Sequence, residues 1–240
     1  MLPHSETKMA KRIETPMIIA MKGHPGSGKT TLARSLASTL RIPLIDKDDV
    51  RDSTFSLQNS LHSSSSLLND LSYDAVFRVA STQLNLGLSV IVDSPLSCRA
   101  RLDDLLRSAA PAGARLIIVE CKPSDEAEWR RRLETRGGSS WHKPSTWDDM
   151  ERLLQGYDGC TDYDVGDVPK VMVDTTAPVE LEELVSRVLE FILSHSAPSL
   201  PLHWSCPSRL KVYPPSFKNQ DFLLLGLVLS TGTFWDSSSL

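Results

Sequence analysis

Cysteine is scarce in this sequence, and its few copies lie far apart. The four cysteines of the 240-residue chain are Cys98, Cys121, Cys160 and Cys206, and no two form a C-x-x-C pair. Close cysteine pairs are typical of zinc sites, and dense sets are typical of disulfide frameworks in small secreted domains. The spacing here fits neither pattern. We therefore expect reduced thiols and a cytoplasmic protein.

A targeting segment, a long apolar run and an excess of positive charge are also missing. Residues 1–15 contain no apolar stretch of the secretory kind, and their glutamates do not suit an organelle-targeting peptide. The apolar run 222–235 has 14 residues, whereas a spanning helix needs roughly 18 or more. We therefore expect no transmembrane segment. The formal net charge of −4 gives no global basic field, so it does not support a nucleic-acid partner, although a local basic channel stays open.

A glycine-rich stretch at residues 17–31, MIIAMKGHPGSGKTT, is the feature around which the rest of the chain is organised. An apolar run predicts a buried strand over 17–21, and residues 23–30 fit the phosphate-binding loop (P-loop) pattern G-x-x-x-x-G-K-[ST]. Leu32, Leu36 and Leu40 then form a helical stripe. A chance match is disfavoured because the strand and the helix flank the loop as the motif requires.

Such a loop holds a polyphosphate through backbone N–H groups and the positive end of the helix dipole. Lys29 is expected to reach the β- and γ-phosphates, and the hydroxyl of Thr30 to bind Mg²⁺. The residues predicted to bind the nucleotide in this stretch are Gly23, His24, Pro25, Gly26, Ser27, Gly28, Lys29, Thr30 and Thr31.

Short apolar strands alternate with helical patterns along the chain. Further strands are predicted at 41–46, 89–93, 114–121 and 170–174, and further helices at 67–86, 97–110, 124–136, 147–155 and 178–193. In the helix 67–86, Leu68, Leu71, Ala75 and Val79 are assigned to one face. Ser124 is predicted to cap the third of these helices and Ser145 to start the fourth. The alternation predicts a three-layer α/β/α fold with a five-stranded parallel sheet.

The remaining segments predict the domain boundaries. We expect a disordered leader at 1–15, one domain at 16–195 with a lid at about 124–156, and an irregular, proline-rich tail at 196–240. The tail is expected to pack on the domain or to be poorly ordered, with a membrane-surface or partner-binding role as the alternative. The serine-rich segment 53–66 is interpreted as a mobile segment over the site or a surface loop.

Two charged features point to the acceptor and the metal. Asp48 and Arg51 follow the second strand, whose carboxyl end is expected to border the P-loop. The carboxylate there could accept a proton from an attacking hydroxyl, and the guanidinium could hold an anionic acceptor. A charged surface turn is the alternative.

Asp93 ends the third strand, where an aspartate can hold Mg²⁺ directly or through water. The alternative is a turn aspartate. Because Asp93-Ser-Pro lacks the glycine of D-x-x-G, a GTPase is not expected.

A third feature, the arginine-rich sequence at 130–136, places Arg132 and Arg136 on one helical face, because residues four apart lie side by side. Two guanidinium groups at this spacing can stabilise the charge that develops on a transferring phosphoryl group. The alternative is a solvated basic face paired with Glu128 and Glu134.

The combination resembles the small P-loop kinases of the P-loop nucleoside triphosphate hydrolase superfamily, close to the polynucleotide-kinase and chloramphenicol-phosphotransferase group. The R-D-D-x-R pattern of that group reads Lys47-Asp48-Asp49-Val50-Arg51 here. The resemblance implies that Asp48 is the general base and that Arg51 holds the acceptor's phosphate. The lid pattern R-x-x-x-R matches residues 132–136, and Thr175 and Thr176 match the position where these kinases hold adenine. Two departures are Lys47 in place of the first arginine and the segment 52–70, which matches no acceptor pattern.

We therefore expect an ATP- and Mg²⁺-dependent kinase that transfers the γ-phosphoryl group to a hydroxyl of a small molecule or of a nucleotide or oligonucleotide end. We expect the protein to be a monomer. Lys29, Asp48, Arg132 and Arg136 are the predicted catalytic residues. Asp48 and Arg51 are predicted to bind the acceptor, and Thr30 and Asp93 the metal. The alternatives are an ATP-binding regulatory or interaction protein and an ATPase that drives a partner.

Overall fold

The computed structural model describes residues 13–60, 65–136, 142–157 and 161–196. Its strands are β1 (Met17–Lys22), β2 (Leu44–Asp46), β3 (Val90–Asp93), β4 (Arg115–Cys121) and β5 (Lys170–Val173). Its helices are α1 (Lys29–Leu40), α2 (Lys47–Ser53), α3 (Phe55–Ser60), α4 (Ser65–Asn85), α5 (Arg99–Ala109), α6 (Glu126–Thr135), α7 (Trp147–Tyr157) and α8 (Leu181–Ser194), with a short 3₁₀ turn at Ala110–Ala112.

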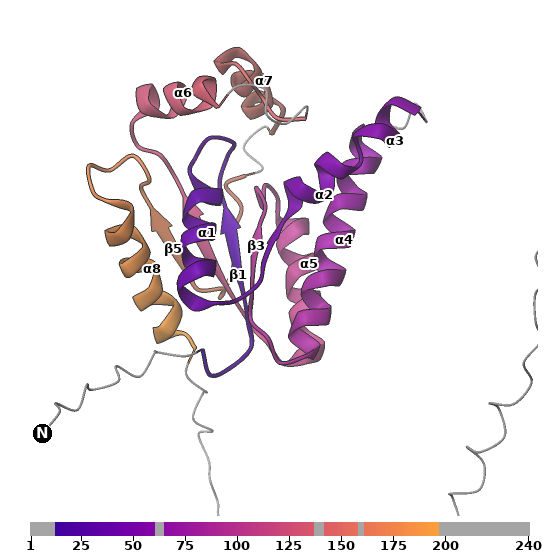
Figure 1. The fold of residues 1–240 in the computed structure, drawn as a ribbon, viewed down its shortest axis with the longest axis vertical. Helices are drawn as coiled ribbons and strands as arrows, with labels where there is room; N and C mark the ends of the chain where they lie inside the picture. Colours follow the sequence, from indigo (N-terminus) through magenta and orange to yellow (C-terminus); the bar gives the residue numbers. More distant parts are fainter. Residues whose placement is uncertain (1–12, 61–64, 137–141, 158–160, 197–240) are drawn as a thin grey trace, which may run out of the picture. The chain divides into compact units, whose positions relative to one another are not determined.

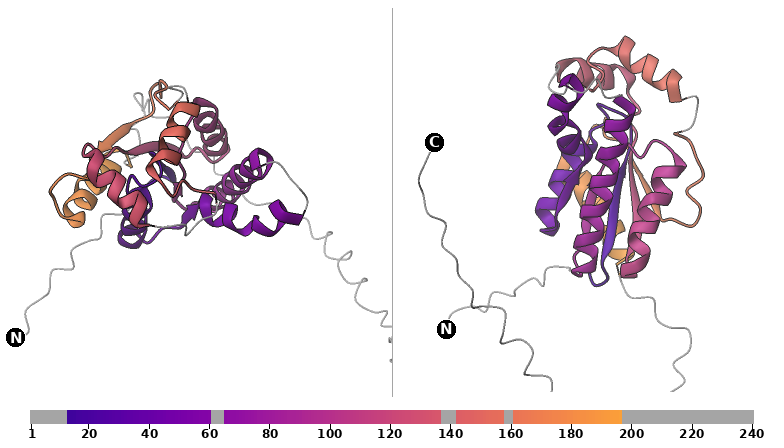
Figure 2. Two further views of the ribbon diagram at one scale, coloured as in Figure 1. Left: turned by 90° about the horizontal axis from the view of Figure 1, so that it is seen from above. Right: turned by 90° about the vertical axis from the view of Figure 1, so that its right-hand side faces the viewer.

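The five strands form one parallel sheet in the order β2-β3-β1-β4-β5. Helices α1 and α8 cover one face of this sheet, and α4 and α5 cover the other (Figure 1). The two perpendicular views of Figure 2 show the same three layers. The predicted α/β/α fold with a five-stranded parallel sheet is therefore confirmed.

The central strand β1 is buried along its whole length because helices pack on both of its faces. Met17, Ile19 and Met21 point toward α1 and α8, where they pack with residues such as Leu32. Ile18 and Ala20 point toward α4 and α5 and join the second core. This alternation fixes the register of β1 and brings the chain after Lys22 to the carboxyl edge of the sheet.

Helices α6 and α7 lie above this edge, over the loop between β1 and α1 (Figure 1). They have a small core of their own, in which Leu133, Trp147 and Met150 are buried. The predicted helices at 124–136 and 147–155 are found, but their caps differ. Asp125, rather than Ser124, caps α6 by accepting a hydrogen bond from the Glu128 N–H at 3.1 Å. Thr146, rather than Ser145, accepts one from the Asp149 N–H at 3.2 Å near the start of α7.

One expectation on the β2 side of the sheet is wrong, the one for the serine-rich segment. The described part of the serine-rich segment is helical, because α3 covers 55–60 and α4 begins at Ser65. In α4, Leu71 and Val79 are 48% and 46% exposed, and the buried side chains include Tyr73 and Val76. Helix α4 therefore has two neighbouring rows of apolar side chains. The row that packs on the sheet contains the aromatic residues Tyr73 and Phe77.

Several predicted features lie outside the described residues: 1–12 of the leader, 61–64 of the serine run, 137–141 of the lid, Cys160, and the tail from 197, which includes Cys206. Of the leader, Ile13 is described and packs against the core. Cys98 and Cys121 are both free thiols. No helix in the described part of the chain is long and apolar enough to cross a membrane.

Candidate functional site

The loop between β1 and α1 has the backbone of a phosphate-binding loop. Gly23, Gly26 and Gly28 have φ values of 143°, 78° and 82°, a region that side-chain-bearing residues rarely adopt. At Gly23, a Cβ atom would lie 2.5 Å from the Cys121 carbonyl oxygen, so the loop can pass β4 this closely only with glycine. Lys29 begins α1, and its Nζ donates to the His24 carbonyl at 3.1 Å, so the ammonium lies against the loop.

A cleft of about 1540 Å³ opens beside this loop. This volume exceeds the roughly 300–1,000 Å³ of usual small-ligand pockets, so the cleft has room for a nucleotide and a second substrate. Its walls come from the P-loop, α1, α2, α4, α5, the lid and the loop after β5. The predicted residues that line it are Pro25, Gly26, Gly28, Lys29, Thr30, Thr31, Asp48, Arg51, Arg132, Arg136 and Thr175.

Asp93 ends β3 beside the loop, as predicted, and is only 2% exposed. Its Oδ2 has no hydrogen-bond partner among the described residues. Asp46 on β2 is its register partner, and burial, followed by the charge of Asp93, raises the pKa of Asp46 to about 6. A buried carboxylate oxygen without a donor, beside a second carboxylate, fits a hard cation such as Mg²⁺. Thr30, at the start of α1, lines the cleft and carries a hydroxyl suited to the same ion.

Asp48 reaches the cleft from α2 rather than from the end of a strand next to β1, because β3 separates β2 from β1. Three cationic or basic side chains surround its carboxylate. Lys143 Nζ lies 2.7 Å from Oδ2, and His142 Nε2 and Lys47 Nζ lie 3.2 and 3.4 Å from Oδ1. Burial raises the pKa of Asp48, but the hydrogen bonds and charges of these neighbours outweigh it, so the pKa lies well below its usual range.

Arg51 lines the cleft, but its side chain is mostly used within the fold. It is 1% exposed. Its guanidinium donates to Thr54 Oγ1 at 2.8 Å, to Ser65 Oγ at 2.9 Å and to Gln58 Oε1 at 3.3 Å. These bonds tie α2 to α3 and α4. Its predicted role on the acceptor's phosphate stays a prediction.

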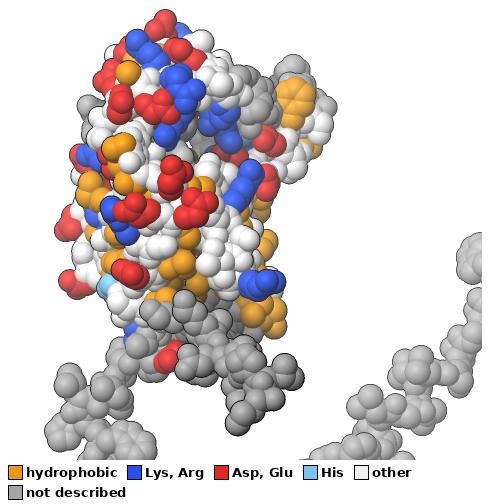
Figure 3. All heavy atoms as spheres, turned by 60° about the vertical axis from the view of Figure 1, so that its left-hand side comes forward, with side chains coloured by type: hydrophobic (Ala, Val, Ile, Leu, Met, Phe, Trp, Pro, Cys, Tyr) orange, Lys and Arg blue, Asp and Glu red, His pale blue; other side chains and the backbone are white. Residues whose placement is uncertain are grey.

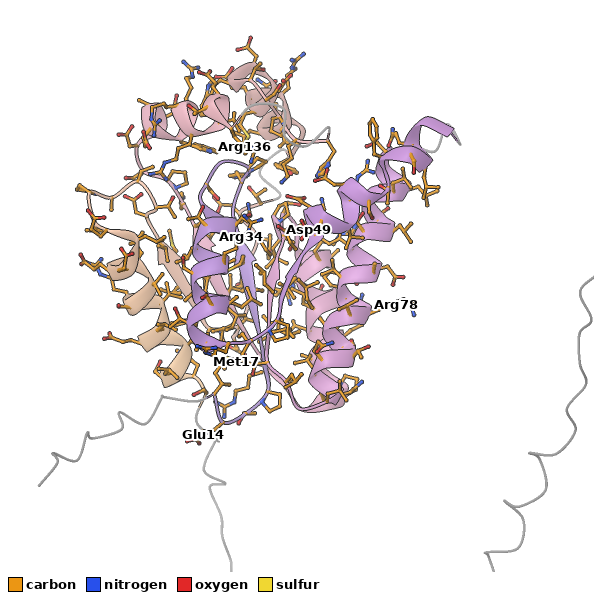
Figure 4. The ribbon with its side chains drawn as sticks, in the orientation of Figure 1. Glu14, Met17, Arg34, Asp49, Arg78 and Arg136 are labelled. Carbon is orange, nitrogen blue, oxygen red and sulfur yellow. The ribbon has the colours of Figure 1, made fainter. Side chains whose placement is uncertain are left out.

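The two lid arginines lie on one side of α6, as their spacing predicts, but they contact different parts of the protein. Arg132 donates to Glu128 Oε1 at 2.7 Å and to the Thr175 carbonyl at 2.9 Å, which ties it to the loop after β5. Arg136, below the lid helices in Figure 4, donates to the Pro144 carbonyl at 3.3 Å. Burial lowers the pKa of Arg136, and the negative charge of Asp48 only partly offsets this effect. Of the two lid arginines, Arg136 is therefore the one that interacts electrostatically with Asp48.

The two threonines after β5 have different places. Thr175 lines the cleft, and its Oγ1 donates to the Ser27 carbonyl at 2.7 Å, which holds the loop after β5 against the P-loop. Thr176 Oγ1 instead bonds to Asp174 at 2.7 Å and accepts from the Ser124 and Asp125 N–H groups at 3.0 Å. Thr175 therefore borders the cleft beside the P-loop, whereas Thr176 fixes the start of the lid. The predicted contact of both residues with the nucleotide stays a prediction.

An aromatic contact joins the lid to the P-loop. The His24 ring stacks between Trp129 and Tyr157, with centroid distances of 6.0 and 5.9 Å. The indole N–H of Trp129 donates to the Pro25 carbonyl at 2.8 Å. Burial, then the charges of Lys29 and Lys22, lower the pKa of His24 to about 4, so its ring is neutral at pH 7. His24 and Pro25 thus serve as a docking surface for the lid.

Sequence reasoning missed Lys47, His142, Lys143 and Trp129. In the R-D-D-x-R motif, Lys47 was noted only because it replaces the first arginine, and no role was predicted for it. His142 and Asp48 are 94 positions apart in sequence, and no local pattern indicates that they meet. Acidic and basic side chains are interspersed on the face shown in Figure 3, so the basic residues of the site do not continue into a broad basic surface there.

Comparison with known proteins agrees with this geometry. The family model described as "AAA domain" matches residues 18–156, more than half of the chain. No curated protein matches the sequence.

Solved structures with the same fold are numerous. A sugar kinase from Janibacter sp. HTCC2649 matches with a TM-score of 0.56 and 18% identity, over 77% of this chain and 99% of that one. A gluconokinase from Sinorhizobium meliloti 1021 matches with a TM-score of 0.51 and 22% identity, over 77% and 95%. Kti12 from Chaetomium thermophilum, solved in complex with ADP-AlF3, matches with a TM-score of 0.52 and 19% identity, over 73% and 98%. At these identities the likeness concerns the fold.

Proposed function

The chain belongs to the AAA domain family, and from this premise we propose that it is an ATP-dependent kinase with an alcohol as acceptor. It uses the P-loop to bind the triphosphate and transfers the γ-phosphoryl group to a hydroxyl of a small molecule or of a nucleotide end. Its motif after β2, residues 47–51, favours the polynucleotide-kinase and chloramphenicol-phosphotransferase group within the P-loop kinases. Two of the solved structures with this fold are a sugar kinase and a gluconokinase, which supports the same reaction class.

One observation carries the proposal. Asp48 lies in the same cleft as the P-loop, on a different wall, and its carboxylate is held ionised by Lys47, His142 and Lys143. An ATPase or a nucleotide-dependent switch needs a carboxylate at its metal site, but it does not need a second, ionised carboxylate on another wall of the cleft. A general base that faces the γ-phosphate is what hydroxyl activation requires.

In the transfer step the acceptor's hydroxyl oxygen forms a bond to the γ-phosphorus, and the bond from that phosphorus to the β–γ bridging oxygen breaks. The hydroxyl proton passes to Asp48, and ADP leaves with the bridging electron pair. Lys29 and Arg136 lie at the cleft with charges that can stabilise the phosphoryl group in transfer. Docking of the lid through Trp129 helps to exclude water, which would otherwise compete as an acceptor.

Thr30 and Asp93 would hold Mg²⁺. The ion, when bound, neutralises charge on the β- and γ-phosphates. Thr30 offers its hydroxyl from the first turn of α1, and Asp93 offers its buried oxygen at the end of β3.

The experiment is a phosphoryl-transfer screen of the full chain with ATP and Mg²⁺ against nucleosides, nucleotides, 5′-hydroxyl oligonucleotides and sugars. In Asp48→Asn the transfer rate should fall by about 10²- to 10⁴-fold, whereas ATP affinity should stay within a few fold, because the Asp48 carboxylate is not part of the P-loop.

Acceptors with a lower hydroxyl pKa should rescue Asp48→Asn more than Arg136→Ala, because Arg136→Ala removes a positive charge rather than the base. Transfer by Asp48→Asn at the wild-type rate would remove the base assignment. Robust ATP hydrolysis without any acceptor would favour an ATPase instead.

A further inference from the structure

The imidazole of His142 joins the lid to two carboxylates of α2. Its Nε2 lies 3.2 Å from Asp48 Oδ1, and its Nδ1 lies 3.2 Å from Asp52 Oδ1. One ring can reach both carboxylates because residues four apart lie on the same face of a helix. The side chain of His142 is 10% exposed, so most of this contact is shielded from water. The acceptor side of the lid is therefore held to α2 through both nitrogens of one ring.

The proton content of this ring decides how well it can hold both carboxylates. An imidazolium has two N–H groups and can donate to Asp48 and Asp52 at once, whereas a neutral imidazole has one N–H and places a lone pair against the other carboxylate. Hydrogen bonds that involve charged groups are also roughly twice as strong as neutral ones. The contact is thus strongest with a protonated ring, and it weakens as the pH rises through the titration of the ring.

Cations around Asp48 oppose a positive charge on His142. Lys47 on α2 and Lys143 in the lid lie 3.4 and 2.7 Å from the Asp48 carboxylate. Arg136, at the end of α6, interacts electrostatically with the same carboxylate. Three cations therefore share the charge of Asp48 with the ring, and a protonated ring needs a second carboxylate to be held in this place.

The lid has another attachment, on the P-loop side, that carries no charge. The indole N–H of Trp129 donates to the Pro25 carbonyl at 2.8 Å. Burial, then the charges of Lys29 and Lys22, lower the pKa of His24 to about 4, so the ring stacked on Trp129 stays neutral near pH 7. The two attachments can therefore be separated by experiment, because the protonation of the P-loop side is constant across neutral pH.

We propose that His142 is a latch that closes the lid on the acceptor side, and that Asp52 supplies the second carboxylate that holds the protonated ring in place. This inference rests on the proposed kinase function. The closed latch fixes Asp48 Oδ1, and the acceptor hydroxyl can use the lone pair of Oδ2 that Lys143 leaves free. Release of the latch lets water enter and compete with the acceptor. His142 and Asp52 are thus positioning residues, which act through Asp48.

The first experiment measures the latch without turnover. Hydrogen–deuterium exchange of the full chain is followed by mass spectrometry at lid residues 142–150, with the buried strand β1 as the internal reference. Asp52→Asn should exchange at these lid residues about 10-fold faster than wild type at pH 6, because the second carboxylate is lost. After correction for intrinsic exchange rates, the difference should shrink as the pH rises, because the wild-type ring loses its proton.

The matched control is Asp74→Asn, which removes an exposed carboxylate paired with Arg78 on α4. It should exchange as wild type does at the lid residues. Equal exchange of Asp52→Asn and wild type at pH 6 overturns the inference. A difference that stays constant with pH also overturns it, because a merely structural role of Asp52 would give that result.

Transfer assays separate the latch from the kinase proposal. With an acceptor found in the screen, His142→Gln and Asp52→Asn should each raise the ratio of ATP hydrolysed to ATP transferred by about 10-fold. Affinity for a non-hydrolysable ATP analogue should not change, because the Trp129 attachment remains. The double variant should be no worse than the poorer single variant, because both substitutions remove one interaction.

The outcomes distinguish the two proposals. A wild-type ratio of hydrolysis to transfer in both single variants leaves the kinase standing and overturns the latch. Faster lid exchange in Asp52→Asn, together with no transfer to any alcohol by wild type, supports the latch and refutes the kinase.

Discussion

Glu120 joins two lysines at the carboxyl edge of the sheet, and its replacement by glutamine is the most informative test of the fold that supports the site. Glu120 on β4 pairs with Lys22, the last residue of β1, and with Lys170 on β5, whose Nζ lies 2.9 Å away. The side chains of Lys22 and Glu120 are 7% and 10% exposed, whereas that of Lys170 is 31% exposed. Lys22 directly precedes Gly23 of the P-loop, so this ion pair fixes the start of the loop.

Glu120→Gln leaves the Lys22 ammonium buried without a counter-ion. Breaking a buried pair in this way costs about 3–5 kcal/mol, and the lower end applies because glutamine can still accept a hydrogen bond. A loss of about 3 kcal/mol should lower Tm by about 6–12 °C in a domain of this size. The assays are urea unfolding and calorimetry. The control is Glu183→Gln, which removes an exposed i,i+4 pair with Arg187 and should change stability by about 0–1 kcal/mol.

The effect should also depend on pH with a definite sign. Burial raises the pKa of Glu120, but the hydrogen bonds from Lys22 and Lys170 more than offset this, so the folded-state pKa is lowered. The carboxylate therefore stabilises the fold above its unfolded pKa of about 4.3, and this stabilisation is lost as the pH falls through the lower folded value. Wild type and Glu120→Gln should differ most near neutral pH and converge in acid. The double variant Lys22→Met, Glu120→Leu should recover most of the stability. Equal unfolding midpoints of Glu120→Gln and wild type at pH 7 would refute the reasoning.

Three further predictions concern the nucleotide. Lys29→Ala should abolish ATP turnover and weaken triphosphate binding with an unchanged circular dichroism spectrum; unchanged turnover would remove the P-loop assignment. Truncation after Ser196 should leave ATP binding intact by calorimetry, because the five strands and their helices end before it; a folded truncated protein that fails to bind ATP would place later residues in the site. Trp129→Phe should weaken ATP-analogue binding by about 2- to 10-fold through loss of the bond to Pro25, whereas Trp147→Phe, whose indole bonds to Glu151 within α7, should not.

The sheet and the loop could be predicted from the sequence because each depends on local signals. The apolar run at 17–21 and the glycines that follow need only their own neighbours to be recognised, and the structure has them as β1 and the loop. The helical stripes of α1 and α8 were equally clear, since each has one apolar face.

The errors have tertiary causes. Residues 55–60 have little helical pattern of their own, and they lie next to Arg51, whose bonds to Thr54, Gln58 and Ser65 connect α2, α3 and α4. Helical spacing alone does not show which apolar face of α4 is buried: Leu71 and Val79 repeat at this spacing, yet both side chains are exposed. The surroundings of Asp48 depend on His142 and Lys143, which the lid brings back from far along the chain.

The bond between Trp129 and the Pro25 carbonyl gives the protein a built-in optical reporter. The indole lies against the P-loop with the imidazole of His24 stacked on it. A protonated imidazole quenches indole emission, but the low pKa of His24 keeps that ring neutral above about pH 5. The emission of Trp129 is therefore insensitive to pH across the neutral range and sensitive to whatever moves the loop or the lid. The chain has five tryptophans, so filling and emptying of the loop can be followed in real time, without an attached dye, in a variant that keeps only Trp129.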